Sequence, residues 1–197
     1  MKLRSIIYYQ SLFCFPISVL SFINILYSSY FDYYLNLSAY LVTLILSLTV
    51  GLIFLIFGKK SEKRINFYEQ ILLILLTYII ISGLVSLPYY LSIYQISFID
   101  ALFESFSGLT LTGFSIFDNI KQIDPTLILW RSSSQWIGGF YFIIFLVLIF
   151  SHKQINFKML DLTFNLEKKI NFSSNLFNVS NRILLIFLFL TLLIFLF

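Results

Sequence analysis

The sequence predicts an all-α polytopic membrane protein with about five transmembrane helices and one re-entrant half-helix followed by a pore loop. Hydrophobic residues make up 59% of the 197 residues and charged residues only 11%, whereas soluble domains carry roughly 25% charged residues. The mean hydropathy is +0.93. The net charge of +4 comes from basic residues in short segments between apolar runs, so it indicates membrane topology and gives no reason to expect a nucleic-acid partner.

The first two apolar runs predict an N-terminal helical hairpin over residues 1–58. Residues 6–27 follow a short basic start, and Pro16 is expected to kink the helix that they form. A secretory signal peptide begins in the same way, but no cleavage site of small residues follows this run. A short link without Lys or Arg leads to the second predicted span, 37–57.

Residues 59–151 predict a second unit, made of a span, a short helix, a loop and another span. A basic block precedes the third span, 67–87, which is expected to end at Pro88. The fourth span is predicted to begin at Pro125, because proline suits the first helical position after a capping residue such as Asp124. It continues to about residue 150.

The last unit, 152–197, predicts a polar cytoplasmic linker and then a fifth apolar run, 183–197. This run is about 22 Å long as a helix, which is shorter than a ~30 Å hydrocarbon core. We therefore expect it to be an interrupted part of a longer design.

Residues 97–115, between the third and fourth spans, predict a half-helix and a loop. Hydrophobic residues recur at helical spacing over 98–107, and Ser97 with Asp100 are placed as a capping box. At 1.5 Å per residue such a helix covers about half of a ~30 Å hydrocarbon core. The Gly/Thr loop that follows must bury its carbonyl groups in protein or turn them toward water or an ion. This segment therefore predicts a cation site.

The distribution of basic residues predicts the orientation of the chain. Of the 13 Lys and Arg residues, all but Lys121 and Arg131 fall in segments on one side, which the positive-inside rule assigns to the cytoplasm. We therefore expect a cytoplasmic N-terminus and a half-helix that is entered and left from the outer side.

Two motifs, DALFESFSGLTLTGFS at 100–115 and LWRSSSQWIGGF at 129–140, carry a resemblance to a known family. They resemble the first pore repeat of the Trk/Ktr/HKT superfamily of potassium transporters, and within it the TrkH-type subunits. The matching residues are Asp100, Phe103, Glu104, Ser107, Gly108, Thr110, Thr112, Gly113, Trp130, Arg131, Gln135, Trp136, Gly138 and Gly139.

The resemblance implies a potassium uptake subunit of the bacterial plasma (inner) membrane, in which four pore loops surround one pathway. The filter here would be 109–113, beginning at Leu109, with K⁺ held by backbone carbonyls of Thr110, Leu111, Thr112 and Gly113. No other cofactor is implied. The half-helix would support the filter through Asp100, Glu104, Ser107 and Gly108, and the next span through Arg131, Gln135, Gly138 and Gly139. TrkH-type subunits also pair with a cytoplasmic nucleotide-binding regulatory subunit.

The sequence departs from the family pattern at three positions. Leu111 replaces a threonine, Phe114 stands where a small residue is usual, and Tyr141 replaces a third glycine. The change at Tyr141 argues against close packing of this helix on its neighbour.

One pore loop is expected in this chain, whereas the family pathway requires four. The resemblance also implies that residues 182–197 are the first helix of an incomplete second repeat. We therefore expect the N-terminal portion of a transporter, which would need further copies or a partner chain carrying the remaining repeats. A non-conducting fragment or accessory membrane subunit is the alternative hypothesis. An enzyme is not expected, because a single histidine and scattered carboxylates form no catalytic cluster.

Glu104 has two interpretations, because a charge at membrane depth is costly and requires a partner. It could be an ion ligand or a proton carrier. We favour a structural role, in which it bonds backbone amides of the filter or pairs with Arg131.

Overall fold

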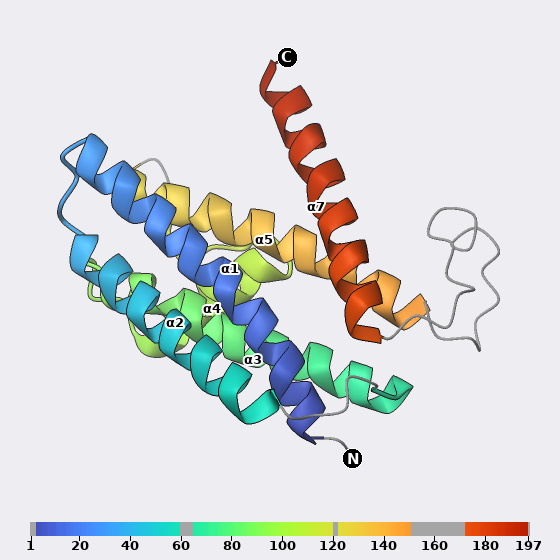
Figure 1. Ribbon diagram of the computed structural model, residues 1–197. Helices are drawn as coiled ribbons and strands as arrows, with labels where there is room; N and C mark the ends of the chain where they lie inside the picture. The colour runs from blue at the N-terminus through green and yellow to red at the C-terminus, as the bar shows by residue number, and fades with distance from the viewer. Residues whose placement is uncertain (1–2, 60–64, 120–121, 151–171, 197) are drawn as a thin grey trace.

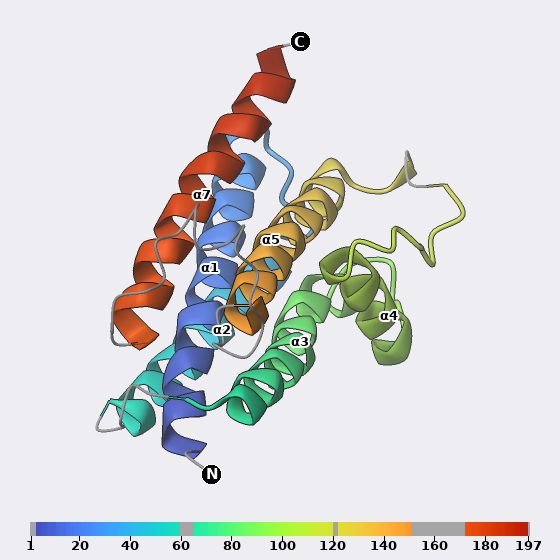
Figure 2. The same cartoon turned by 90° about the vertical axis from the view of Figure 1, so that its right-hand side faces the viewer.

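A computed structural model describes residues 3–59, 65–119, 122–150 and 172–196. These residues form the helices α1 (Leu3–Tyr30), α2 (Leu37–Gly58), α3 (Phe67–Tyr90), α4 (Phe98–Leu109), α5 (Pro125–Phe150) and α7 (Phe172–Leu196). The basic residues at 60–64, Lys121 and the predicted linker at 151–171 lie outside the described residues. Helices α1, α2, α3 and α5 pack side by side, and the short α4 contacts α3 and α5 (Figure 1). Figure 2 shows α7 and α4 on opposite sides of α5.

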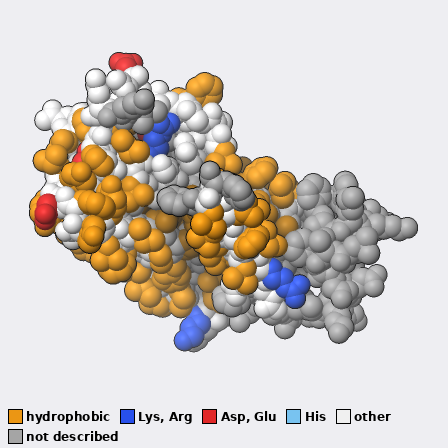
Figure 3. Space-filling view, turned by 90° about the horizontal axis from the view of Figure 1, so that it is seen from above, with side chains coloured by type: hydrophobic (Ala, Val, Ile, Leu, Met, Phe, Trp, Pro, Cys, Tyr) orange, Lys and Arg blue, Asp and Glu red, His pale blue; other side chains and the backbone are white. Residues whose placement is uncertain are grey.

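The described helices confirm the prediction of an all-α polytopic membrane protein. Helices α1, α2 and α3 are long and apolar enough to cross a membrane. Helices α5 and α7 have 26 and 25 residues, and α5 contains the polar run 131–135. The apolar part of α7 within the described residues, Ser180–Ile194, is shorter than the about 20 apolar residues that a span requires. Length and composition thus show three of the five predicted spans. Hydrophobic side chains also cover much of the described part of the face that Figure 3 shows.

Several helix ends differ from the sequence prediction. Helix α3 continues through Pro88 to Tyr90, where the predicted span stops at residue 87. The largest difference is in α7, which begins at Phe172 and not at 183. Residues 172–182 contain neither proline nor glycine, so nothing in their sequence stops the helix from extending beyond its apolar part.

Close backbone contact joins α1 to α2. A Cβ atom added at Gly58 would lie 2.5 Å from Cα of Tyr8, a distance that forbids a side chain at position 58. The buried Ser21 hydroxyl donates a 2.6 Å hydrogen bond to the Tyr40 carbonyl oxygen across the same interface. Small residues therefore bring the two helices together.

Asn36, in the link between α1 and α2, connects this helix pair to the rest of the bundle. Its side-chain amide donates to Asp124 Oδ2 at 2.8 Å and its Oδ1 accepts from the Ile93 backbone N–H at 3.2 Å. The Thr126 hydroxyl also donates to Asp124 Oδ2. The Asp124 carboxylate, predicted to cap α5, is therefore engaged by the hydroxyl of the first turn and by Asn36.

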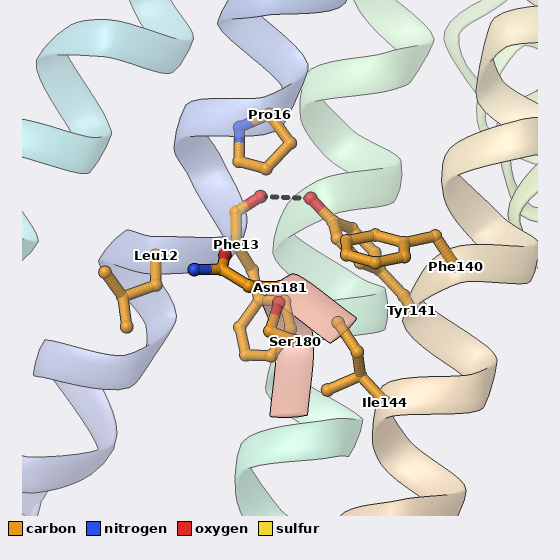
Figure 4. A pocket seen from close by; sticks show the side chains of 8 residues that line it. All are labelled: Leu12, Phe13, Pro16, Phe140, Tyr141, Ile144, Ser180 and Asn181. Carbon is orange, nitrogen blue, oxygen red and sulfur yellow. Dashed lines mark hydrogen bonds between the residues drawn. The ribbon is translucent and has the colours of Figure 1, made fainter. Parts of the chain in front are cut away.

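Tyr141 joins α5 to α1 near the proline of α1. Its side chain is 2% exposed, and its hydroxyl donates a 2.6 Å hydrogen bond to the Phe13 carbonyl oxygen, three residues before Pro16 (Figure 4). The rings of Phe13 and Tyr141 meet edge to face with centroids 5.2 Å apart. The expectation that Tyr141 prevents close packing is therefore wrong, because its hydroxyl finds a backbone acceptor on the neighbouring helix.

Candidate functional site

Helix α4 is the predicted half-helix, and it extends slightly beyond residue 107 to Leu109. Its 12 residues give about 18 Å at 1.5 Å per residue, well short of a ~30 Å hydrocarbon core. At its start the Asp100 backbone N–H donates to Ser97 Oγ at 3.2 Å, and the Ser97 hydroxyl donates to Asp100 Oδ2 at 2.7 Å. Ser97 is thus the predicted N-cap, but the Asp100 carboxylate binds the Ser97 hydroxyl in place of its backbone N–H.

The chain reverses direction after α4 through two residues in the left-handed region. Leu111 has φ +61° and Gly113 has φ +78°. The Leu111 N–H donates to the Gly108 carbonyl and the Thr112 N–H to the Ser107 carbonyl, both at 3.2 Å. Glycine adopts such a conformation freely, whereas a residue with a Cβ pays about 1–2 kcal/mol for it. The sequence analysis did not predict the left-handed backbone conformation of Leu111.

Hydroxyl groups hold the loop against the end of α4. The Ser107 hydroxyl donates to the Phe114 carbonyl at 2.5 Å and accepts from the Thr112 hydroxyl at 3.2 Å. The Thr110 hydroxyl donates to the Phe106 carbonyl at 2.6 Å. All three hydroxyls donate their hydrogens to groups of the loop or of α4 and so stabilise the course of the loop.

The carbonyls of the loop divide into free and engaged groups. Within the described part of the chain, no hydrogen bond reaches the carbonyl oxygens of Thr110, Leu111 or Thr112, and all three residues are exposed. The Gly113 carbonyl lies 3.5 Å from Arg131 Nη2, which leaves a lone pair open because a carbonyl oxygen has two. Leu109, the first predicted filter residue, is buried.

A buried ion pair holds the segment 113–116, which leads out of the loop, in place. Arg131 Nε lies 2.8 Å from Glu104 Oε1, and the Glu104 side chain is fully buried. Glu104 Oε2 accepts from the Ile116 N–H at 2.9 Å, and the Ser115 hydroxyl lies 3.2 Å from each carboxylate oxygen. Arg131 Nη2 also donates to the Phe114 carbonyl at 3.3 Å. Glu104 therefore pairs with Arg131, one of the two contacts that the sequence analysis favoured, whereas the backbone amide that it accepts from is that of Ile116, after the predicted filter 109–113.

Glycines let α4 rest directly on α5. A Cβ atom at Gly138 would lie 2.4 Å from the Leu109 carbonyl oxygen, and one at Gly108 would lie 2.6 Å from Ser134 Oγ and 4.0 Å from Cγ of Gln135. On the other side of α4, the buried Ser105 hydroxyl donates to the Ser82 carbonyl of α3 at 2.9 Å. The half-helix is thus held between the two long helices that flank it in sequence.

An all-helical fold in which three helices are long and apolar enough to cross a membrane, with a short helix and a loop packed against two of the long helices, defines the class as a polytopic membrane protein. A profile of the family described as TrkH: Cation transport protein matches residues 37–197. The chain therefore belongs to the TrkH family of cation transport proteins.

Known relatives match shorter parts of the chain. It is 35% identical over 94 residues to an uncharacterized cation transporter of Methanocaldococcus jannaschii (45% of this chain, 20% of the relative). It is 39% identical over 72 residues to the Trk system potassium uptake protein TrkI of Halomonas elongata (36% and 15%). It is 28% identical over 112 residues to the Trk system potassium uptake protein TrkH of Escherichia coli (56% and 23%).

These matches span about a fifth of the length of the relatives. No solved structure gives a significant match to the chain.

Proposed function

We propose that the chain is a potassium-transport subunit of the TrkH type, in which residues 109–113 form part of an ion filter. The observation that carries the proposal is the set of free carbonyls at Thr110, Leu111 and Thr112, directly after a half-helix that is held on both sides. The names of the relatives in Halomonas elongata and Escherichia coli describe potassium uptake proteins, which supports K⁺ as the ion.

In this proposal the loop replaces the water molecules around a dehydrated K⁺ with backbone carbonyls. The C-terminal end of α4 adds a partial charge of about −0.5 next to the loop, which favours a cation. Glu104 contributes little net charge, because Arg131 neutralises it at 2.8 Å. Its function is to hold the segment 113–116, so that the carbonyl groups of the loop keep their positions when an ion passes.

The pathway would be completed by further pore loops, supplied by other copies of this chain or by a chain that carries the remaining repeats. Support comes from the surface that α4 and the loop leave open. Leu111 is 51% exposed and Phe114 67%, and a series of apolar side chains on α4 is exposed beside them: Phe98, Ile99, Phe103 and Phe106. A carbonyl filter encloses an ion from several sides, so this surface would face the other loops.

The orientation that we propose has a cytoplasmic N-terminus in the plasma membrane of a bacterium. Three described basic residues support it: Arg4 at the start of α1, Lys59 directly after α2, and Arg182 in the first half of α7. The half-helix would then open toward the outside.

The test is growth at low potassium of an Escherichia coli strain that lacks its own potassium uptake systems. One strain expresses the full chain. Another expresses the Escherichia coli TrkH protein in which residues 67–150 of this chain replace the matching segment, so that the other repeats are present. We expect the chimera to restore growth. Failure of the chimera, with the protein confirmed in the membrane, would contradict the proposed filter.

The two strains distinguish the ways in which the pathway is completed. Growth with the full chain alone would mean that its copies assemble a working filter. Growth with the chimera only would mean that this chain requires a partner that carries further loops.

A further inference from the structure

Two adjacent glycines of α5 face different parts of the site. A Cβ atom at Gly138 would collide with the end of α4, as described above. A Cβ atom at Gly139 would lie 3.3 Å from Cζ of Phe187 in α7 and 3.7 Å from Cδ1 of Leu111 in the loop. The surface of α5 at Gly139 is therefore shared by the filter loop and by α7.

Phe187 is the residue that α7 brings to this surface. Its ring centroid lies 5.1 Å from that of Trp136 and 6.4 Å from that of Phe140, both on α5. Ile183, one turn earlier in α7, is 4% exposed. Neighbouring residues on the other face of α7, such as Phe189 at 64% exposure, lack this packing. Phe187 thus marks the position at which α7 rests on α5.

Leu111 is the residue that the loop brings to the same surface. Its φ of +61° is unfavourable for a leucine, and such a conformation persists only when the surroundings impose it. Its backbone N–H makes one 3.2 Å hydrogen bond to Gly108, and half of its side chain is exposed. Its Cδ1 lies 3.7 Å from the position that a Cβ of Gly139 would occupy, so the side chain lies over the part of α5 that carries no side chain.

We propose that Phe187 is a positioning residue for the filter loop. By occupying the Gly139 surface it limits where the Leu111 side chain can lie, and so stabilises the left-handed conformation that orients the neighbouring carbonyls. This inference rests on the proposed function only in treating 109–113 as an ion filter.

The test is hydrogen–deuterium exchange of the full chain in lipid nanodiscs, followed on peptides that cover 109–114. Phe187→Ala is expected to raise the exchange rate of the loop amides at least threefold. The matched control Phe189→Ala removes an exposed ring from the same helix and should leave the rate within twofold. Leu111→Ala should raise the rate as Phe187→Ala does, and the double variant should add little, because both residues act through one surface.

Equal loop exchange in the Phe187→Ala and Phe189→Ala proteins would overturn the inference, as would fully additive effects of the two alanine substitutions. Peptides from α3 report on general unfolding. If their exchange also rises in Phe187→Ala, the milder Phe187→Leu variant replaces it, and a loop unchanged in that variant overturns the inference. Since exchange is measured without ion transport, a failure of the proposed function would leave this result intact, and the two can fail separately.

Discussion

The Glu104 carboxylate of the half-helix and the Arg131 guanidinium of α5 lie 2.8 Å apart. Both groups also form hydrogen bonds with the backbone of the segment that follows the proposed filter loop. One charge comes from the helix before the loop and the other from the helix after it. The pair therefore fixes the distance between α4 and α5 and the path of the segment 113–116. A buried pair of this kind adds little net stability, but removal of one partner leaves an uncompensated buried charge.

Arg131→Gln should therefore be strongly destabilising. We expect a loss of about 3–5 kcal/mol, because the fully buried Glu104 carboxylate would remain without its counter-charge. Unfolding of the purified protein by titration with a denaturing detergent measures this loss.

The control is a double-mutant cycle with Glu104→Gln. The two single losses should exceed the loss in the double variant by about 1–3 kcal/mol, the coupling expected of residues in contact. Additive effects would show that the two side chains do not stabilise each other.

Gly138→Ala should displace the half-helix. Its new methyl group would lie 2.4 Å from a backbone oxygen of α4, which cannot move aside as a side chain can, and we expect a cost of about 1–3 kcal/mol. Gly83→Ala is the matched control, because no atom lies within 4 Å of that Cβ position and alanine favours a helix. Thermal unfolding should show a lower midpoint for the first variant and an unchanged or higher one for the second. Equal midpoints would contradict the close contact.

Much of this architecture can be predicted from the sequence, because the bilayer imposes simple rules. Apolar runs of about 20 residues between basic segments specify spans and their direction. The half-helix is equally clear, since a short amphipathic segment before a Gly/Thr loop cannot cross the membrane. The partner of Glu104 could be anticipated as well, because a charge at that depth requires a counter-charge.

Other features depend on contacts that no local pattern reveals. The positive φ of Leu111 is absent from the sequence prediction, because leucine rarely adopts it and only the surrounding packing imposes it. Phe187 lies in an almost uniform run of leucine, isoleucine and phenylalanine, so nothing distinguishes the face that meets α5. Tyr141 was expected to loosen packing because of its size, and its hydroxyl acceptor on α1 becomes evident only in three dimensions.

Tyr141→Phe should weaken the contact between α5 and α1. It removes the 2.6 Å hydrogen bond to the Phe13 carbonyl while it keeps the ring in place, and we expect a cost of about 0.5–1.5 kcal/mol. Tyr90→Phe, at a residue that is 46% exposed, is the control and should change the free energy of unfolding by much less. A Tyr141→Phe protein as stable as the control would show that the hydrogen bond contributes nothing.

Asn36→Ala should weaken the attachment of the α1–α2 pair to the neighbouring ends of α3 and α5. Asn36 is 1% exposed and bonds both Asp124 and the Ile93 backbone, so its removal breaks two hydrogen bonds, at about 0.5–1.5 kcal/mol each, while Asp124 keeps the Thr126 hydroxyl. Faster deuterium exchange at the Ile93 amide would report the change directly. The exposed Asn181→Ala variant serves as the control. Unaltered protection of the Ile93 amide in Asn36→Ala would contradict the proposed connection.

The most direct test of the filter is uptake of radioactive Rb⁺, a close substitute for K⁺, by proteoliposomes that contain the chimera carrying residues 67–150. The account predicts uptake that excess K⁺ competes away and excess Na⁺ does not. Gly113→Ala should abolish this selectivity or the uptake itself, because the φ of +78° at that position disfavours alanine by about 1 kcal/mol or more. Gly83→Ala should preserve both. Uptake with equal competition from Na⁺, or a Gly113→Ala protein that behaves like Gly83→Ala, would contradict the claim that this loop selects potassium.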